Sequence, residues 1–276
     1  PGGKYYLTED LDLGNNYIQL NAGVGEITVC LNGHTLSSTS KMVFRYNNSC
    51  DATLNICDCV GGGTIGEGWD GLTNTSSSAF SVIRADSGTT LNLYAGSITG
   101  VKDSHGIVYL MGGATFNMYG GTISGGKAYD GGAIYAGASS TLNLSGVKIT
   151  DCSAVRGGAI NLVDNCNASF TNTKFTANSA TGKANNEGGG AINAEKGSLI
   201  LSGVLMDGNT SAYYGGAINA RKGTVEIKDT VITNSKGGTG ATSKAAALDA
   251  LGIHFCESDP GTYVAGDFYF ILGGNG

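Results

Sequence analysis

The chain has 276 residues, of which 47 are Gly and only 2 are Pro, and 14% of its residues are charged. Its net charge of −6 and its few, scattered Lys and Arg residues exclude the basic stripe with which a protein tracks nucleic-acid phosphates. No apolar run approaches the roughly 18 residues of a membrane span, so we expect no membrane insertion. These properties favour one elongated domain over residues 1–276, monomeric in isolation.

A repeat of roughly 26 residues, with three short apolar segments in each copy, follows an N-terminal cap and first coil at residues 1–20. One complete copy spans residues 131–162. Within a segment apolar and polar residues alternate, as in Leu142-Asn143-Leu144, which is the pattern of a β-strand. The first segments are marked by Ile18, Phe44, Phe80, Ile107, Ile134, Ile160, Ile192 and Ile218, with Ala247 as a weak ninth.

The other two segments of each copy are equally regular. The second segments are marked by Val29, Ile56, Leu93, Met118, Leu144, Phe170, Leu201 and Ile227. The third segments are marked by Leu36, Ile65, Ile98, Ile123, Ile149, Phe175, Met206 and Ile232. The pattern predicts an all-β fold, a right-handed single-stranded parallel β-helix of about eight to nine coils with three short strands each.

The two ends of the chain depart from this pattern. Residues 245–276 predict a degenerate last coil, and the run Lys244 to Leu251 is the one stretch where a helix is plausible, although it also fits a weak first strand. Because the first residue is Pro1 rather than Met, we expect a piece of a longer chain.

Length variation is concentrated in one corner of the repeat. From Leu93 onward, the second and third markers are always five residues apart. The connection from the third marker back to the next first marker varies most, and its longest copies are Gly66 to Ser78, Thr176 to Gly190 and Thr233 to Ala246. Insertions in solenoids collect on one face, which is often the binding face, so we expect the functional surface at this corner.

The same corner contains the catalytic candidates Asp103, Asp130 and Arg156, each four residues before a first marker in consecutive coils. Stacking would place Asp103 and Asp130 roughly 5 Å apart, which is also the carboxylate separation of retaining glycosidases. The alternative interpretation is structural: Arg156 forms an ion pair with Asp130.

Aromatic side chains surround these charges. We expect binding residues at Trp69, Tyr129, Asp130, Tyr135, Arg156, Tyr213 and Tyr214. Flat apolar rings beside directional hydrogen-bonding groups suit a glycan or a host protein surface. Some of these tyrosines could instead only cover the coil beneath them.

The seven cysteines leave two interpretations open. Cys30 and Cys57 occupy one outward column of adjacent coils, where a disulfide is geometrically possible, and Cys50 with Cys59 is a second possible pair. The interpretation that we favour is that they are buried or half-buried thiols that pack as small apolar groups. The Cys57-Asp58-Cys59 spacing is not that of a zinc site, and the three His residues lie in unrelated columns, so we expect no metal and no cofactor.

Two motifs resemble known surface proteins. Gly-Gly-Ala-Ile occurs at 131–134, 157–160, 189–192 and 215–218, and Phe175-Thr-Ala-Asn178 follows one copy. This combination resembles the repeats of chlamydial polymorphic outer membrane proteins and related β-helix adhesins. The opening stretch, Tyr5 to Thr8 and then Ile27 to Leu36, looks like β-helix regions in large surface proteins of gut-dwelling Gram-positive bacteria.

The resemblance implies an exported, extracellular passenger that is used for adhesion at a bacterial cell surface. We therefore expect a non-catalytic module that binds a host or microbial glycan or a host protein. The alternative is a carbohydrate-active enzyme, either a polysaccharide lyase or a glycoside hydrolase, working at Asp103 and Asp130.

Overall fold

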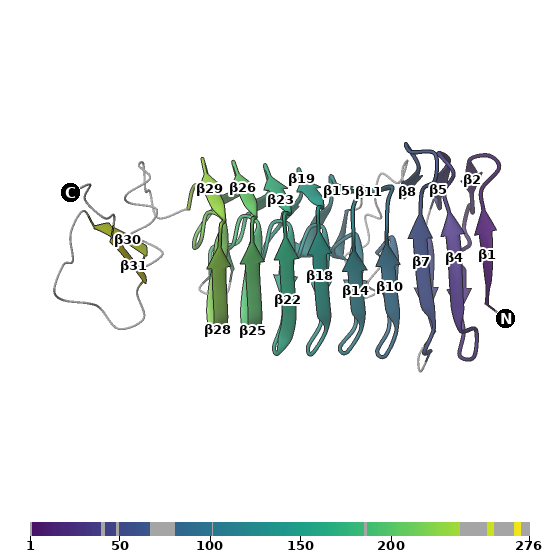
Figure 1. Ribbon diagram of the computed structural model, residues 1–276, viewed down its shortest axis with the longest axis horizontal. Helices are drawn as coiled ribbons and strands as arrows, with labels where there is room; N and C mark the ends of the chain where they lie inside the picture. Colours follow the sequence, from purple (N-terminus) through teal and green to yellow (C-terminus); the bar gives the residue numbers. More distant parts are fainter. Residues whose placement is uncertain are drawn as a thin grey trace.

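The computed structural model describes residues 2–39, 42–47, 50–66, 81–100, 102–184 and 187–237, together with the strands Ile253–Cys256 and Phe268–Ile271. These residues form no helix, and hence none that could cross a membrane. The chain winds into a parallel β-solenoid of about eight turns, as predicted, with strands stacked along the long axis of a rod (Figure 1).

The largest sheet has 15 strands because it includes both the first and the second strands of the coils. The first strands are β3 (Ile18–Leu20), β6 (Phe44–Tyr46), β9 (Ile83–Ala85), β13 (Val108–Leu110), β17 (Ile134–Ala136) and β21 (Ile160–Leu162). The second strands are β1 (Gly3–Tyr6), β4 (Glu26–Cys30), β7 (Thr53–Cys57), β10 (Thr90–Leu93), β14 (Thr115–Met118), β18 (Thr141–Ser145) and β22 (Cys166–Thr171). Two long strands, β25 (Ile192–Ser202) and β28 (Ile218–Lys228), span both positions and join the two sets.

The third strands form a separate sheet of nine. They are β2 (Leu11–Asp12), β5 (Thr35–Ser37), β8 (Thr64–Ile65), β11 (Ser97–Thr99), β15 (Thr122–Ser124), β19 (Lys148–Thr150), β23 (Lys174–Thr176), β26 (Leu205–Asp207) and β29 (Val231–Thr233). Near the C-terminus β30 (Ile253–Cys256) pairs in parallel with β31 (Phe268–Ile271) in a sheet of two. The proposed helix from Lys244 to Leu251 lies outside the described residues.

A fourth short sheet occupies the corner where the sequence predicted only variable connections. It consists of β12 (Lys102–His105), β16 (Lys127–Asp130), β20 (Ser153–Ala154), β24 (Ser179–Ala180) and β27 (Thr210–Ser211). Three of these strands have only two residues, which is too short to show alternation, and β12, with the sequence Lys-Asp-Ser-His, contains no apolar residue, so the sequence pattern could not reveal them. The middle coils therefore have four strands rather than three. Two of the long connections, Gly66 to Ser78 and Thr233 to Ala246, lie for the most part outside the described residues.

The predicted register of the second and third strands is confirmed at every marker. Leu93, for example, pairs with Ile56 and Met118, and Ile149 pairs with Ile123 and Phe175. In the first strands two markers are wrong. Ile83 and Val108 stack between Phe44 and Ile134, in place of Phe80 and Ile107.

The mistake at Ile107 has a physical cause. Both Ile107 and Val108 are fully buried, so hydrophobicity does not distinguish the corner residue from the strand residue. Phe80 lies outside the described residues.

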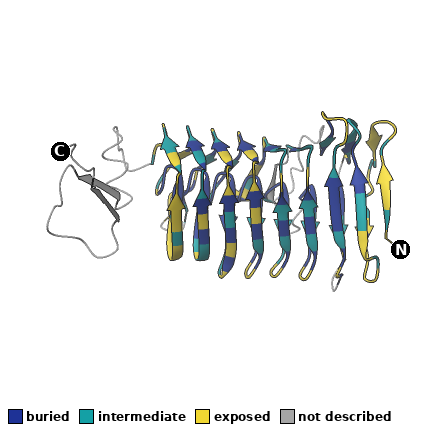
Figure 2. Ribbon diagram, in the orientation of Figure 1, coloured by how far each residue is buried: buried dark blue, intermediate teal, exposed yellow. Residues whose placement is uncertain are grey.

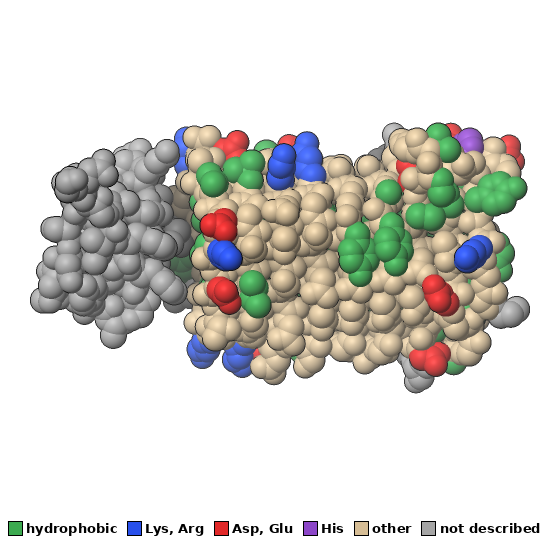
Figure 3. Space-filling model, viewed as in Figure 1, with side chains coloured by type: hydrophobic (Ala, Val, Ile, Leu, Met, Phe, Trp, Pro, Cys, Tyr) green, Lys and Arg blue, Asp and Glu red, His purple; other side chains and the backbone are tan. Residues whose placement is uncertain are grey.

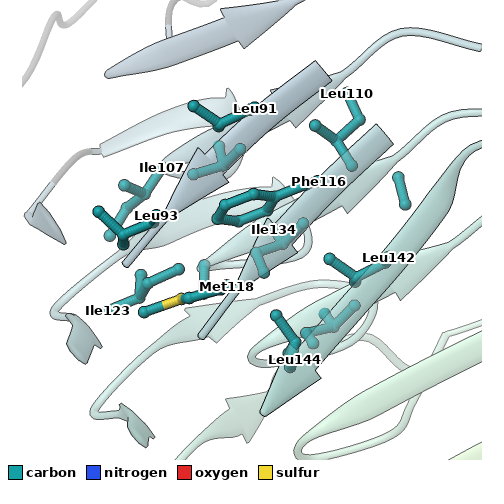
Figure 4. Close-up of a cluster of buried hydrophobic side chains, with 14 of the residues drawn as sticks. Leu91, Leu93, Ile107, Leu110, Phe116, Met118, Ile123, Ile134, Leu142 and Leu144 are labelled. Atoms are coloured by element: carbon teal, nitrogen blue, oxygen red, sulfur yellow. The ribbon is translucent and has the colours of Figure 1, made fainter. Parts of the chain in front are cut away.

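Buried residues recur along the strands of successive coils (Figure 2), and their side chains form one continuous hydrophobic core. In the second strands Leu91, Phe116 and Leu142 stack in register and are fully buried. Figure 4 shows these side chains beside Ile134 of the first strand and Ile123 of the third strand.

The Gly-Gly-Ala-Ile motif is explained by backbone packing. Its first glycine has a positive φ, 61° at Gly157, which other residues rarely adopt. A Cβ on the second glycine, Gly158, would collide with the carbonyl oxygen of Gly190 in the next coil. The following Ala159 and Ile160 are fully buried. The motif thus allows successive coils to approach closely at the corner.

The asparagine of Phe-x-x-Asn connects three coils. The side-chain oxygen of Asn178 accepts the N–H of Cys152 at 3.1 Å, and its amide donates to the carbonyl oxygen of Ile149 at 3.1 Å and to Asn209 Oδ1 at 2.9 Å. Both asparagines are fully buried. They satisfy backbone groups that the turn leaves without partners in the sheets.

Candidate functional site

The candidate site lies at the corner where the fourth sheet leads into the first strands. A column of residues from five successive coils marks this corner. His105 pairs with Asp130, Asp130 with Arg156, and Gly188 with Tyr214, while Gly157 N–H donates to the Gly188 carbonyl oxygen. The glycine-rich turns that follow direct the chain into β13, β17, β21, β25 and β28.

The predicted pairing of Asp103 with Asp130 is wrong. Asp103 stands opposite Ala128, and His105 takes the place next to Asp130. The turn after His105 reaches Val108 with one residue fewer than the turn from Asp130 to Ile134, and this shifts the register. The side chain of Asp103 lies outside the described residues. The two-carboxylate arrangement that suggested a retaining glycosidase is therefore not formed by this pairing.

The alternative interpretation, an ion pair between Asp130 and Arg156, is confirmed. Arg156 Nε donates to Asp130 Oδ1 at 2.6 Å and Nη2 donates to Oδ2 at 2.8 Å, which is a bidentate contact between adjacent coils. Arg156 Nη1 also lies 3.7 Å from Glu195 Oε1. Asn161 Nδ2 also donates a hydrogen bond to Asp130 Oδ1 at 3.4 Å.

Burial and the ion pair act in opposite directions on the pKa of the Asp130 carboxyl. Asp130 is only 5% exposed, and burial raises the pKa of its carboxyl, while the positive charge of Arg156 opposes that shift. Burial alone would lower the pKa of Arg156, but the charge of Asp130 raises it. The guanidinium thus stays charged, with its side chain 23% exposed and able to donate outward.

Three aromatic rings pack together beside the ion pair. The His105 ring stacks on Tyr109 with centroids 4.9 Å apart and meets Tyr135 edge-on at 4.7 Å, while Tyr109 and Tyr135 are 5.2 Å apart. Tyr109 and Tyr135 are neighbours in the outward column of the first strands. Burial raises the pKa of Tyr135 to about 12, so its phenol remains a hydrogen-bond donor.

The outward column continues past Tyr135 as a ladder of amides. Asn193 donates to Asn161 at 2.7 Å and Asn219 donates to Asn193 at 2.8 Å. On the other side Arg84 lies 5.9 Å from the centre of the Tyr109 ring and donates to Asp86 at 2.9 Å. The amides stabilise the stacking of the coils.

The structure brings together four of the predicted binding residues: Tyr129, Asp130, Tyr135 and Arg156. Tyr129 is 50% exposed, and the guanidinium of Arg156 lies 5.3 Å from the centre of its ring. With His105 and Tyr109, which the sequence interpretation missed, these residues are here called the aromatic corner.

Two other predicted residues lie farther along the rod. Tyr213 and Tyr214 pack edge-on with centroids 4.2 Å apart, and in the corner column the coil of Gly188 separates Tyr214 from Arg156. Trp69 lies outside the described residues.

A repeated tetrapeptide could have revealed Tyr109. Gly106-Ile107-Val108-Tyr109 has the same pattern as Gly132-Ala133-Ile134-Tyr135, with Gly followed by two apolar residues and Tyr.

A second aromatic pair was also missed. Tyr94 and Tyr119, each one residue beyond a second-strand marker, stack with centroids 5.1 Å apart and an interplanar angle of 15°. They are 49% and 53% exposed. Figure 3 shows hydrophobic side chains gathered over β10 and β14 on a face that is otherwise mostly uncharged. Beside them Asn55, Asn92, Asn117 and Asn143 form a second amide ladder.

The cysteines separate into two groups. Cys30 and Cys57 are in register in adjacent coils, as predicted, but the sulfur contact of Cys30 is with Cys59, at 2.7 Å. Cys50 is buried in the core, and neither of the two possible disulfides, Cys30–Cys57 or Cys50–Cys59, is formed. Burial raises the pKa of Cys152 to about 12 and that of Cys166 to about 11, as expected for inert packing thiols.

Searches of protein-family models, of curated proteins and of solved structures found no match to this chain. The chemistry of the site must therefore be argued from its own groups. The aromatic corner offers ring faces, a charged guanidinium and phenol groups, and the partly exposed carboxylate of Glu195 lies beside it. Its most buried carboxylate, Asp130, is already bound to Arg156 through both oxygens. This arrangement is suited to binding.

Proposed function

We propose that the protein is a non-catalytic binding module of a bacterial surface protein and that it recognises a glycan through the aromatic corner. The observation that supports this most directly is the contact of three rings, His105, Tyr109 and Tyr135, beside the bidentate ion pair of Asp130 and Arg156. Sugar rings present an apolar C–H face and equatorial hydroxyls. A site that combines ring faces with fixed donors and acceptors matches both.

The geometry favours a preorganised site. The guanidinium of Arg156 is fixed by Asp130 on one side, approached by Glu195 on another, and stacked against Tyr129. Side chains that are already ordered lose little conformational entropy when a ligand binds. Tyr129 supplies the most exposed ring of the group and is our candidate for the first stacking contact.

The charge balance points to the class of glycan. Arg156 is flanked by Asp130 and Glu195, so the group has no excess of positive charge with which to attract a polyanion. A neutral, hydroxyl-rich glycan avoids the desolvation cost of bringing further charge to the corner. We therefore place neutral glycans ahead of uronate polymers and of a host protein.

The sequence motifs support the cellular setting of this proposal. Gly-Gly-Ala-Ile and Phe-x-x-Asn serve coil packing in this solenoid, and they resemble the repeats of β-helix adhesins. We propose on that basis an extracellular, cell-surface location. The motifs carry no information on the ligand, because their side chains face the core or the neighbouring coil.

A carbohydrate-active enzyme is the weaker alternative. General acid–base cleavage of a glycosidic bond requires two carboxyl groups that are free to exchange protons. Asp103 does not pair with Asp130, and Asp130 is committed to Arg156. Incubation with plant and mucin polysaccharides tests this alternative: sugar release that is lost in Asp130→Asn would favour the enzyme.

A glycan array carrying plant, microbial and mucin glycans tests the binding proposal. We expect the wild-type chain to bind a restricted set of neutral glycans, and we expect Tyr109→Ala together with Tyr135→Ala to abolish the signal. The matched control is Tyr94→Ala together with Tyr119→Ala, which removes two stacked tyrosines elsewhere and should leave the signal unchanged. Binding that survives loss of the corner tyrosines would refute the proposal.

A further inference from the structure

Three cysteines from adjacent coils converge near the N-terminal end of the solenoid, far along the chain from the aromatic corner. The sulfur atoms of Cys30, Cys57 and Cys59 all lie within 4.8 Å of one another. We propose that they form a three-thiolate binding site for a soft monovalent cation, with the cuprous ion as the best fit. This inference does not depend on the proposed glycan function.

The fold brings the three thiols together through strand register and a tight turn. Cys30 ends β4 and Cys57 ends β7, and the two residues are direct neighbours in the parallel pair. Cys59 follows two residues later, so the chain supplies two ligands from one coil and one from the coil before it. The local spacing Cys-x-Cys gives no sign of the third thiol, which comes from a residue 27 positions upstream of Cys57.

Asp58 fixes the turn that carries Cys59. Its two carboxylate oxygens accept the N–H groups of Gly33 at 2.8 Å and of Gly63 at 2.7 Å. One of these donors belongs to the preceding coil and the other closes the turn itself. Because Asp58 is committed to backbone donors, we assign it a positioning role and not a ligand role.

A backbone donor lies next to one of the three sulfurs. The backbone N–H of Cys59 donates to Cys30 Sγ at 3.3 Å, which is the kind of contact that stabilises a metal-bound thiolate. Cys30 is buried, Cys57 is half-buried and Cys59 is exposed, so the group reaches solvent on the side of Cys59. A cation can enter from that side.

The number of ligands selects the cation. No His, Asp or Glu side chain in the described part of the chain joins the three sulfurs. Structural zinc sites use four protein ligands, whereas soft thiolate sets favour cuprous ions. With metal–sulfur bonds of about 2.3 Å, a trigonal site would separate its sulfurs by roughly 4 Å. Cys59 therefore has to move outward from its 2.7 Å contact with Cys30, which its exposed position on the turn permits.

Copper titration of the full chain provides the test. Protein is reduced, freed of reductant without oxygen, and titrated with cuprous ion against a chromophoric cuprous chelator. We expect one equivalent to bind, with ultraviolet sulfur-to-copper charge-transfer absorption. Cys59→Ser should weaken cuprous-ion binding by at least about tenfold, because removing even a residue that only hydrogen-bonds to a metal ligand typically lowers metal affinity by about that factor. The matched control is Cys166→Ala, which removes a buried thiol several coils away and should leave the affinity unchanged.

Circular dichroism on each variant shows whether the solenoid is intact, and Cys57→Ser gives an independent second removal of a ligand. The proposal is overturned if the folded, reduced chain shows no charge-transfer band, or if binding is equally tight in Cys59→Ser. It is also overturned if urea-unfolded chain binds as tightly as folded chain. A protein that forms a Cys30–Cys59 disulfide with oxidised glutathione but takes up no cuprous ion when reduced would contradict it as well.

Discussion

Replacing Ile160 with Ala tests the register on which the whole account rests. Ile160 is fully buried and stacks between Ile134 and Ile192 in the column of first strands. In a solenoid each coil contacts only its neighbours, so a cavity in this column cannot be filled by rearrangement of distant parts. The cost should therefore be that of a well-packed core site.

The magnitude follows from the atoms removed. The substitution deletes three carbon atoms, and at about 0.8 kcal/mol per buried carbon the lost transfer free energy is roughly 2.4 kcal/mol. The cavity that remains adds to this, so we expect a loss of about 2–5 kcal/mol in the free energy of unfolding. Because Ile160 pairs with a residue in each neighbouring coil, the loss of stability should extend to both of those coils.

Equilibrium unfolding in guanidinium chloride, followed by circular dichroism, measures this loss. The matched control is Ile200→Ala, because Ile200 is the same residue type in an outward position and is 38% exposed. We expect the control to change the unfolding free energy by less than about 0.5 kcal/mol. A change below about 1 kcal/mol for Ile160→Ala would mean that the inward and outward faces are exchanged, since a slip of one residue reverses them.

Three further predictions address the turns. Gly158→Ala should cost about 1–3 kcal/mol, because the new Cβ meets the carbonyl oxygen of Gly190, and thermal unfolding would detect it. Asn178→Ala should cost about 1–3 kcal/mol for each buried partner left without a hydrogen bond, and hydrogen exchange should localise the loss to that turn. Hydrogen bonds from the side chains of Asn234 and Thr233 lower the pKa of Asp207 in the folded protein. The ionised carboxylate therefore stabilises the fold at pH values above its unfolded pKa of about 3.9. That stabilisation is lost as the pH falls through the lower pKa of the folded state. The stability difference between wild type and Asp207→Ala, measured by urea unfolding, should shrink in acid; a pH-independent difference would contradict this.

Much of the fold is predictable because the repeat imposes the same constraint many times. From Leu93 onward the second and third strands are joined by a turn of constant length, and alternation within them fixes which side chains face inward, as at Leu142 and Leu144. The first strands are harder to predict, because the chain enters them through turns of different lengths. At Ile107 and Val108 two adjacent buried residues compete for the same marker position.

The site was predictable only in part, for the same reason. Asp130 and Arg156 were placed together correctly because their turns have equal length, whereas the shorter turn after His105 brought that residue, and not Asp103, to the corner. The tyrosine stack at Tyr94 and the contact of Cys59 with Cys30 depend on which residues extend one or two positions past a strand. Counting residues from the nearest marker does not predict where a side chain beyond the end of a strand lies.

The central claim, that the aromatic corner is the binding surface, is tested most directly by calorimetric titration of paired variants with a neutral glycan retained on the array. Tyr129→Ala with Tyr135→Ala should weaken binding by about tenfold or more, since each lost ring contact is worth on the order of 1 kcal/mol. Tyr94→Ala with Tyr119→Ala should bind like the wild type. If the second pair loses affinity and the first does not, the ligand lies along the amide ladder of Asn92, Asn117 and Asn143, and the account is contradicted.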